Sequence, residues 1–213
     1  MSLTDQQIER YSRQIIVPRI GGNAQERLLK SRIVLLGDLA QIESPLAYLV
    51  GAGVGEIDLA ISDLPAEAEA LSMRMRELNP DVAVRTGHAP QAEYDLAAAF
   101  IASSASLDGA LDLLREVPRR AFVVARLDYP AQIGVFPAPP PCPKCSHQLF
   151  APIGRRAGES GFVSMLATTE AFKLLARYAE RPEATIIQFD GHASRSSVVR
   201  AAPGCICEGQ PSK

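Results

Sequence analysis

The residues with the most specific chemistry in this chain are its cysteines. There are four, arranged as Cys142-x2-Cys145 and Cys205-x-Cys207. In a reducing compartment such cysteines are more often metal ligands or free thiols than disulfides. Each pair supplies half of a tetrahedral thiolate site, so we expect a zinc ion, which is structural because four thiolates leave no open coordination position. The alternative is four thiols without a metal. Either His147 or Glu208 could replace one ligand.

A second stretch that could carry a functional site is 31–55. Its sequence has the pattern of a strand, a turn, a helix and a further turn. This is the opening unit of a sheet that binds nucleotides or dinucleotides. A turn that cradles phosphates needs glycines, because the backbone must bend tightly and direct its amides at the phosphates. The turn here, 37–43, has one glycine, two carboxylates and no lysine. The scaffold therefore predicts a nucleotide-binding fold, whereas the turn predicts that no nucleotide is held.

The elements that would position these residues alternate as in an α/β protein. Thr4 and Gln7 form a capping box for the first helix, and Asn23 caps the second. The expected helices are 5–16, 23–29, a segment around 46–50, 65–78, 107–116 and 162–178. The expected strands are 32–36, 57–61, 82–85, 96–102, 121–126, 132–136, 185–189 and 196–200, the last two as an antiparallel pair. We expect one domain over 1–213, with an N-terminal helical arm (1–30), a Rossmann-like half (31–136) and a cysteine-bearing C-terminal half (137–213).

Composition narrows the class of protein. At 213 residues and 47% hydrophobic content the chain can bury a full core. A net charge of −2 and a pI near 6 argue against binding to nucleic acid or to an anionic membrane surface. There is no apolar run long enough to span a membrane, and the polar, acid-bearing N-terminus is not a signal peptide. We therefore expect a cytoplasmic protein.

Several short motifs occur in order along the chain: RYSRQ at 10–14, and the segments 21–28, 48–55, 78–80 and 170–175, together with the two cysteine pairs. As an ordered set they make the chain resemble the ThiF/MoeB/HesA family, the bacterial relatives of ubiquitin-activating enzymes. The resemblance implies a Rossmann-like mixed sheet flanked by helices, with a small C-terminal antiparallel part and a zinc staple, usually paired as a dimer. It also implies that active members bind MgATP and adenylate the C-terminal glycine of a ubiquitin-like sulfur carrier.

The chain departs from this family at its nucleotide loop. Active members have glycines where this chain has Leu39, Ala40 and Ile42. Each added Cβ restricts the backbone and fills space that the phosphates would occupy. Asp38 and Glu43 place further negative charge beside the path of a triphosphate, which is repulsive.

Other nucleotide contacts implied by the resemblance are also missing. Ile61 stands where the ribose-binding acid is expected, and 64–77 contains no Asn, Gln or Lys, although the family carries all three there. The magnesium-binding aspartate after the fourth strand is replaced by Ser103, Ser104 or Ala105. Losing these groups together removes the positioning and charge neutralisation that phosphoryl chemistry needs. We therefore expect neither ATP nor magnesium as a cofactor.

Three residues remain at positions that the resemblance assigns to a cofactor: Gly37, Asp63 and Arg13. Arg13 matches an arginine that reaches across a dimer to the partner's nucleotide, and its alternative is a solvated helix arginine. The loop 146–161 contains no cysteine for a thioester, so no residue is assigned a catalytic role. The second cysteine pair is one residue tighter than the family's usual spacing.

The leading hypothesis is a non-adenylating member of this family that acts as a binding or scaffold partner. It would pair, as a homodimer or heterodimer, with a ThiF/MoeB-like subunit, and hold a ubiquitin-like or sulfur-carrier protein or a peptide. The alternative is an ATP-dependent adenylyltransferase of a carrier C-terminus, with the nucleotide held by Arg74, Arg76 or the Arg155–Arg156 loop. A third is a cleft re-used for another small molecule, where Asp128 and Tyr129 end a strand.

Overall fold

The computed structural model describes residues 3–61, 63–87, 93–116, 121–152, 161–178, 182–190, 192–205 and 207, of which 114–116 and 147 are described by backbone alone. The helices are α1 (Asp5–Ile15), α2 (Gly21–Lys30), α3 (Leu39–Ala52), α4 (Pro65–Leu78), α5 (Ser104–Glu116) and α6 (Gly161–Leu175), with short 3-10 turns η1 (Pro143–Cys145) and η2 (His147–Phe150). The strands are β1 (Arg32–Gly37), β2 (Glu56–Ile61), β3 (Ala83–Thr86), β4 (Leu96–Ile101), β5 (Ala121–Arg126), β6 (Ala131–Phe136), β7 (Thr185–Phe189) and β8 (Ser194–Val198).

All eight strands form one mixed sheet in the order β3-β2-β1-β4-β5-β6-β7-β8. The first five in this order run parallel, and β6, β7 and β8 are added antiparallel to their neighbours. The antiparallel pairing of the two late strands is confirmed, with the last strand two residues earlier than expected. Instead of forming a separate unit, this pair extends the main sheet, because β6 turns back along β5 and leaves an edge for β7.

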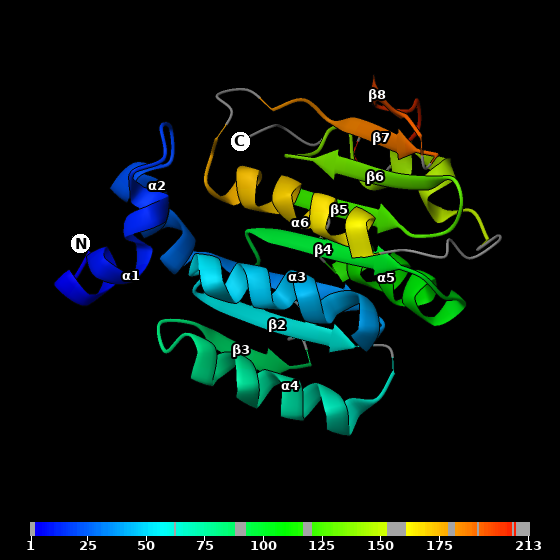
Figure 1. The fold of residues 1–213 in the computed structure, drawn as a ribbon. Helices are drawn as coiled ribbons and strands as arrows, with labels where there is room; N and C mark the ends of the chain where they lie inside the picture. Colours follow the sequence, from blue (N-terminus) through cyan, green and yellow to red (C-terminus); the bar gives the residue numbers. More distant parts are fainter. Residues whose placement is uncertain are drawn as a thin grey trace.

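Two apolar layers hold the helices to the sheet. One layer packs α3, α4 and α6 against the face that carries Ile33, Leu35 and Ile57. The other packs α5 and Leu149 against the face that carries Val34. Figure 1 shows the first three helices in front of the sheet and α5 behind it. The expected α/β sandwich is confirmed, and its continuous apolar strands are typical of parallel sheets buried on both faces.

The connection from β1 to α3 is shorter than the sequence predicts. Residues 39–43, expected as a turn, form the first turn of α3, and Asp38 alone separates strand from helix. Gly37 has φ 153°, and a Cβ there would lie 2.7 Å from the Phe100 carbonyl oxygen on β4. This glycine is therefore required by the close approach of a neighbouring strand. A second correction concerns α2, which begins at Gly21 without a side-chain cap, so Asn23 is not its N-cap.

A buried joint ties α1 to the C-terminal end of α3. The Tyr11 hydroxyl donates to the Asp81 carboxylate (3.0 Å) and accepts from the Asn79 side-chain amide (3.0 Å). The Asn79 amide also donates to the Val50 carbonyl (2.7 Å). The Tyr11 ring lies so close to Gly53, at φ 82°, that a Cβ there would be 2.7 Å away. The capping box between Thr4 and Gln7, which starts α1, is confirmed and fixes the entry to this joint.

The same joint contains two glutamines that share one acceptor. The side-chain amides of Gln14 and Gln25 both donate to the Ala52 carbonyl, at 3.1 and 3.0 Å, and Gln14 also donates to the Gln25 oxygen (2.7 Å). Asn79, Gln25 and Tyr11 are all buried. The family motifs at 10–14 and 78–80 therefore serve a structural joint at the amino ends of the parallel strands.

Tyr11 gives a testable pH dependence. Burial, chiefly, raises its pKa to about 12 from 10.0. Because the folded pKa lies above the unfolded one, the stabilisation is fully present below pH 10 and is lost as the pH rises towards 12. The expected loss is about 3 kcal/mol in the free energy of unfolding, at ~1.4 kcal/mol per pKa unit. Urea unfolding of the wild type and of Tyr11→Phe across this range measures it, with the exposed Tyr129→Phe as control. A wild-type stability that stays level up to pH 12 would contradict the assignment.

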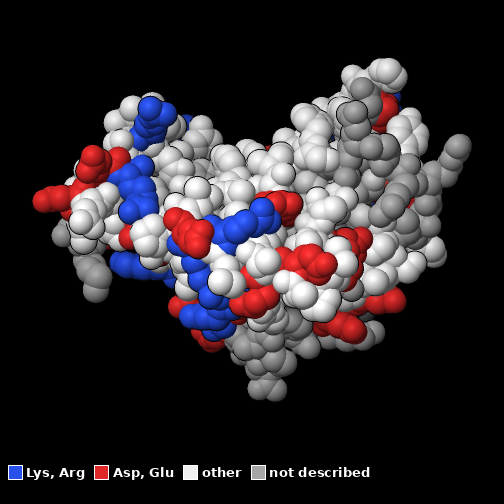
Figure 2. Space-filling view, turned by 60° about the horizontal axis from the view of Figure 1, so that its bottom comes forward, with Lys and Arg blue, Asp and Glu red and all other residues white. Residues whose placement is uncertain are grey.

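The face shown in Figure 2 carries charges of both signs. Lys and Arg lie at its left and centre with Asp and Glu beside them, and Asp and Glu predominate at its lower right. Ion pairs across β1, β2 and β3 join Arg32 to Asp58 (2.8 Å) and Arg85 to Glu56 (2.8 Å). Such a face lacks the continuous basic surface that binding to nucleic acid requires.

Candidate metal centre and the carboxyl end of the sheet

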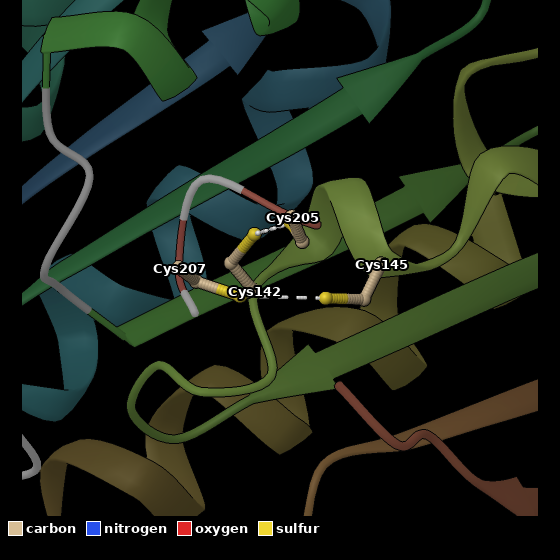
Figure 3. Close-up of side chains that lie close together, drawn as sticks. All are labelled: Cys142, Cys145, Cys205 and Cys207. Atoms are coloured by element: carbon tan, nitrogen blue, oxygen red, sulfur yellow. Dashed lines mark hydrogen bonds between the residues drawn. The ribbon is translucent and has the colours of Figure 1, made fainter. Parts of the chain in front are cut away.

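The four cysteines meet in one place, as the first interpretation of the sequence requires. Cys142 precedes η1, Cys145 ends it, and the C-terminal segment brings in Cys205 and Cys207 (Figure 3). The four sulfur atoms all lie within 4.8 Å of one another. Cys142 and Cys205 are 3.6 Å apart, and Cys145 and Cys207 are 3.4 Å apart. These are far beyond the ~2.05 Å of a disulfide.

The arrangement fits a tetrahedral thiolate site. Zinc–sulfur bonds of about 2.3 Å in tetrahedral geometry place the sulfur atoms about 3.8 Å apart, close to the observed separations. The tight Cys205-x-Cys207 half is accommodated by a turn, in which the Cys205 amide donates to the Ala202 carbonyl (3.1 Å) and Gly204 adopts φ 73°. The Ala202 amide donates to the Cys145 sulfur (3.4 Å), a contact that stabilises a thiolate. The Glu208 and His147 side chains lie outside the described residues.

The pKa value of each of these thiols is shifted by burial and by hydrogen bonds to the other thiols. Burial raises the pKa values of the Cys142 and Cys207 thiols. Burial also acts to raise the pKa of Cys205, but hydrogen bonds from the Cys207 backbone and the neighbouring thiols outweigh it and lower the value. A bound cation would compensate the negative charge of the thiolates, and its binding would release protons. The residues present therefore fit a structural zinc ion.

The N-terminus of α3 lies beside the chain's own carboxylates. Asp63, which follows β2, accepts a hydrogen bond from the Leu39 amide at 2.7 Å. Asp38 accepts one from the Ser103 hydroxyl at 3.0 Å. Ser103 and Ser106 form a reciprocal cap at the start of α5. The Ser106 hydroxyl accepts a hydrogen bond from the Ser103 backbone amide, and the Ser103 hydroxyl accepts one from the Ser106 backbone amide. The ends of β1, β2 and β4 are thus joined to one another through side chains.

This edge is where a helix N-terminus would otherwise attract a phosphate. The Leu39 amide already donates to a carboxylate, and Ile42 is fully buried in the core behind it. Two of the positions that the resemblance assigns to a cofactor, Gly37 and Asp63, therefore lie at the same edge of the sheet. Gly37 is packed against Phe100 of β4, and Asp63 accepts a hydrogen bond from the first residue of α3. A phosphate at this end of α3 would compete with Asp63 for the Leu39 amide and would lie beside a second carboxylate, Asp38.

Arg13 lies elsewhere. It is on α1, whose Tyr11 and Gln14 contact the C-terminal end of α3, whereas Asp63 caps the N-terminal end. A helix of 14 residues is about 20 Å long, so these ends are well separated. Within one chain the structure does not bring Arg13 to Gly37 and Asp63.

The arginines offered for an atypical nucleotide site have protein partners. Arg74 on α4 donates to the Glu43 carboxylate (3.1 Å), and the pair is largely exposed. The Arg76 Nε donates to the Val84 carbonyl on β3 (2.8 Å). Arg155 and Arg156 lie outside the described residues.

One buried ion pair escaped the sequence interpretation. Arg126 is the last residue of β5, and the Nε and Nη2 atoms of its guanidinium each donate a hydrogen bond to the Asp128 carboxylate. Its remaining donors reach carbonyls of the segment that follows the cysteine turn, including Pro152 at 2.8 Å. Asp128 and Tyr129 were offered only as an alternative pair of cleft residues; Asp128 is 4% exposed and pairs with Arg126, while Tyr129 is 60% exposed. An Arg-x-Asp spacing at a strand end, where alternate residues face the same side, is the signal that could have revealed the pair.

Among the helices of the described residues, none combines the length and apolarity needed to cross a bilayer. No protein-family model matches the chain. It is 25% identical to the molybdopterin-synthase adenylyltransferase of Escherichia coli K12 over an alignment of 246 positions, which covers 98% of this chain and 99% of that protein. It is 28% identical to the sulfur carrier protein ThiS adenylyltransferase of the same strain, covering 97% and 98%.

Solved structures agree on the fold. A crystal structure of Escherichia coli MccB with ATP has a TM-score of 0.67 at 15% identity, covering 97% of this chain and 74% of that one. The crystal structure of PaaA has a TM-score of 0.62 at 14% identity, covering 94% and 76%. With relatives aligned along nearly its whole length and the same mixed sheet in the solved structures, this chain is similar to ThiF/MoeB-type adenylyltransferases, which supports its resemblance to the ThiF/MoeB/HesA family of ubiquitin-activating-enzyme-like proteins.

Proposed function

We propose that this protein is a non-adenylating member of its family that acts as a binding or scaffold partner. The observation that carries the proposal is the hydrogen bond from the Leu39 amide to the Asp63 carboxylate at the N-terminus of α3. An anion at a helix N-terminus is stabilised by the backbone amides and the helix dipole. Here the protein supplies that anion itself, from a residue that the chain holds in place.

The charge at this edge supports the same proposal. A triphosphate needs lysine, arginine or magnesium to offset its charge. Two carboxylates, Asp38 and Asp63, accept hydrogen bonds at the start of α3, and Arg74 on α4 pairs with Glu43 of this helix. A nucleotide would have to displace a 2.7 Å charged hydrogen bond and overcome repulsion from two carboxylates. Bound ATP would therefore be unfavourable at this edge.

The relatives suggest the class of partner. They are named as adenylyltransferases of molybdopterin synthase and of the sulfur carrier ThiS, and MccB has been crystallised with MccA peptides. We propose that this chain, as one domain, holds a ubiquitin-like or sulfur-carrier protein or a peptide, in a homodimer or a heterodimer with a ThiF/MoeB-like subunit in the cytoplasm. Arg13, which cannot serve its own α3, would then be available to the nucleotide of the partner subunit.

Pyrophosphate exchange tests the proposal. The protein, purified with zinc, is incubated with ATP, labelled pyrophosphate and a candidate carrier bearing a C-terminal Gly-Gly. The proposal predicts no exchange from this chain alone, and exchange that depends on Arg13 when an active homologous subunit is added. The control is Arg10→Ala, because Arg10 lies on the same helix but hydrogen-bonds to Asn79 within the chain. Exchange by the isolated chain would overturn the proposal.

The second candidate is an active adenylyltransferase with an atypical nucleotide site. It is favoured by one observation, that the relatives aligned along the full chain are named as adenylyltransferases. In that case Arg74 would have to leave Glu43, and the exchange activity of the isolated chain would fall in Arg74→Gln. The same assay therefore separates the two functions.

A further inference from the structure

The sulfur atoms of the cysteine centre form two close pairs, and each pair joins two distant segments of the chain. Cys142 lies 3.6 Å from Cys205, and Cys145 lies 3.4 Å from Cys207, as the dashed lines in Figure 3 mark. The first member of each pair belongs to the segment around η1, and the second to the C-terminal segment. A disulfide of about 2.05 Å would form across either pair if its sulfur atoms approached by about 1.5 Å. Such a bond would join the same two segments that a shared metal ion joins.

Each pair contains one buried and one accessible thiol. Cys142 and Cys207 are 6% and 2% exposed, whereas Cys145 and Cys205 are partly exposed. Oxidants attack cysteines that solvent can reach, whereas buried structural cysteines are inert. In each pair the accessible sulfur can therefore react first, and a buried sulfur lies within 3.6 Å to complete a disulfide. An accessible cysteine beside a second one that resolves it is the arrangement of redox-sensitive sites.

We propose that the cysteine centre is a redox-sensitive zinc site, in which a hydroperoxide converts the pairs Cys142–Cys205 and Cys145–Cys207 into disulfides and releases the metal. Zinc ligation keeps cysteine sulfurs as thiolates, which are the nucleophilic form of the side chain. The residues that hold the metal are therefore also the residues that react with the oxidant. Zinc at the centre is a premise of this proposal, whereas the absence of adenylation is not.

Oxidation of one pair consumes one molecule of peroxide. The Cys205 thiolate attacks a peroxide oxygen, the O–O bond breaks and hydroxide leaves, so that the sulfur becomes a sulfenic acid. The Cys142 thiolate then attacks the Cys205 sulfur and displaces a second hydroxide as the disulfide forms. Two electrons pass from the two sulfur atoms to the peroxide, and two protons from solvent convert the two hydroxides into water. The same reaction at Cys145 and Cys207 leaves the zinc ion without a thiolate ligand.

The choice of sulfur pairs decides what oxidation does to the fold. Bridges within the two sequence motifs, 142–145 and 205–207, would detach the segment 199–207 from η1. Bridges between the segments keep it attached after the metal has left, and they join residues 63 and 62 positions apart. A bridge across so long a loop restrains the unfolded chain and stabilises the folded one. The oxidised, zinc-free protein should therefore be more stable than the reduced, zinc-free protein.

Zinc release and peptide mapping test the proposal on the full-length protein purified with zinc. It is treated with about two molecules of hydrogen peroxide per chain, the free zinc is measured with a colorimetric chelator, and the product is digested with trypsin without reduction. Trypsin separates the cysteines into the peptides 127–144, 145–155 and 201–213. We expect release of about one zinc ion per chain and one disulfide-linked assembly of all three peptides. Fragmentation between Cys205 and Cys207 should assign Cys205 to 127–144, and dithiothreitol with zinc should restore the metal content.

Met73→Leu is the matched control, because Met73 is a 57% exposed methionine that peroxide also attacks. This variant should release zinc as the wild type does, and resistance to release would assign the effect to methionine and overturn the proposal. The proposal also fails if zinc stays bound after peroxide, if 201–213 carries an internal bridge apart from the other peptides, or if the oxidised protein unfolds at a lower urea concentration than the reduced, zinc-free protein. A purified protein without zinc would overturn it as well, by removing the metal site itself.

Discussion

Replacing Cys207 with alanine is expected to abolish stoichiometric zinc binding and to lower the free energy of unfolding by several kcal/mol. Cys207 is 2% exposed, and its sulfur lies 3.4 Å from that of Cys145. Without it the remaining thiolates would hold an incomplete, negatively charged site in a buried position. The segment 199–207 would then lose its attachment to η1, while the main sheet, which has its own core, would remain folded.

Metal analysis of protein washed with a weak chelator, followed by urea unfolding, measures both effects. The wild type should carry about one zinc ion per chain and should lose stability on treatment with a strong chelator. Ser197→Ala on the exposed β8 is the control and should change neither quantity. A wild-type protein that binds no zinc, or a Cys207→Ala variant as stable as the wild type, would contradict a structural metal site.

The second large effect concerns the Arg126–Asp128 pair. Arg126→Leu is expected to cost about 3–5 kcal/mol of unfolding free energy, because it leaves the Asp128 carboxylate buried without its countercharge. It also frees the carbonyls of Ala151 and Pro152, and with them the segment that leads away from the metal site. Replacing both members, Arg126→Leu with Asp128→Leu, should cost less than the single arginine replacement, since no unpaired charge then remains.

Urea unfolding of the two single variants and the double variant forms the required cycle. The control cycle uses Arg85 and Glu56, an exposed pair at 2.8 Å with side chains 50% and 45% exposed, where the coupling should be below about 1 kcal/mol. Strictly additive losses at Arg126 and Asp128 would show that the buried pair is not coupled and would remove its role as an anchor.

Local patterns were enough to locate most elements. α4 begins at Pro65 and ends at Leu78 as expected, because proline is favoured at the first helical position and Asn79-Pro80 stops the helix. Strand β5 matches its expected bounds, since a continuous apolar run is typical of a strand buried on both faces. The meeting of the four cysteines was also predictable, because two closely spaced cysteine pairs are typical of a shared metal site.

The sequence could not reveal features that depend on distant partners. The start of α3 at Leu39 is stabilised by Asp63, which comes 24 residues later and binds only when β2 lies beside β1. Arg126 reaches carbonyls 22 to 26 residues away, and Arg27 bonds to a carbonyl 149 residues away. Such contacts leave no local periodicity.

The family motifs were visible in the sequence, but their role was not. Tyr11, Gln14, Gln25 and Asn79, which carry much of the resemblance, belong to the joint at the C-terminal end of α3. The hydrogen bonds of this joint tie α1 and α2 to the C-terminal end of α3 and involve none of the residues at its N-terminal end. A chain can therefore keep these motifs and the fold while the opposite end of α3 changes its chemistry.

Isothermal titration of MgATP into the zinc-loaded protein tests the central claim most directly. With the Leu39 amide bonded to Asp63 and two carboxylates at the start of α3, the account predicts no saturable heat up to millimolar nucleotide. Saturable binding with a micromolar Kd and a stoichiometry near one would contradict it.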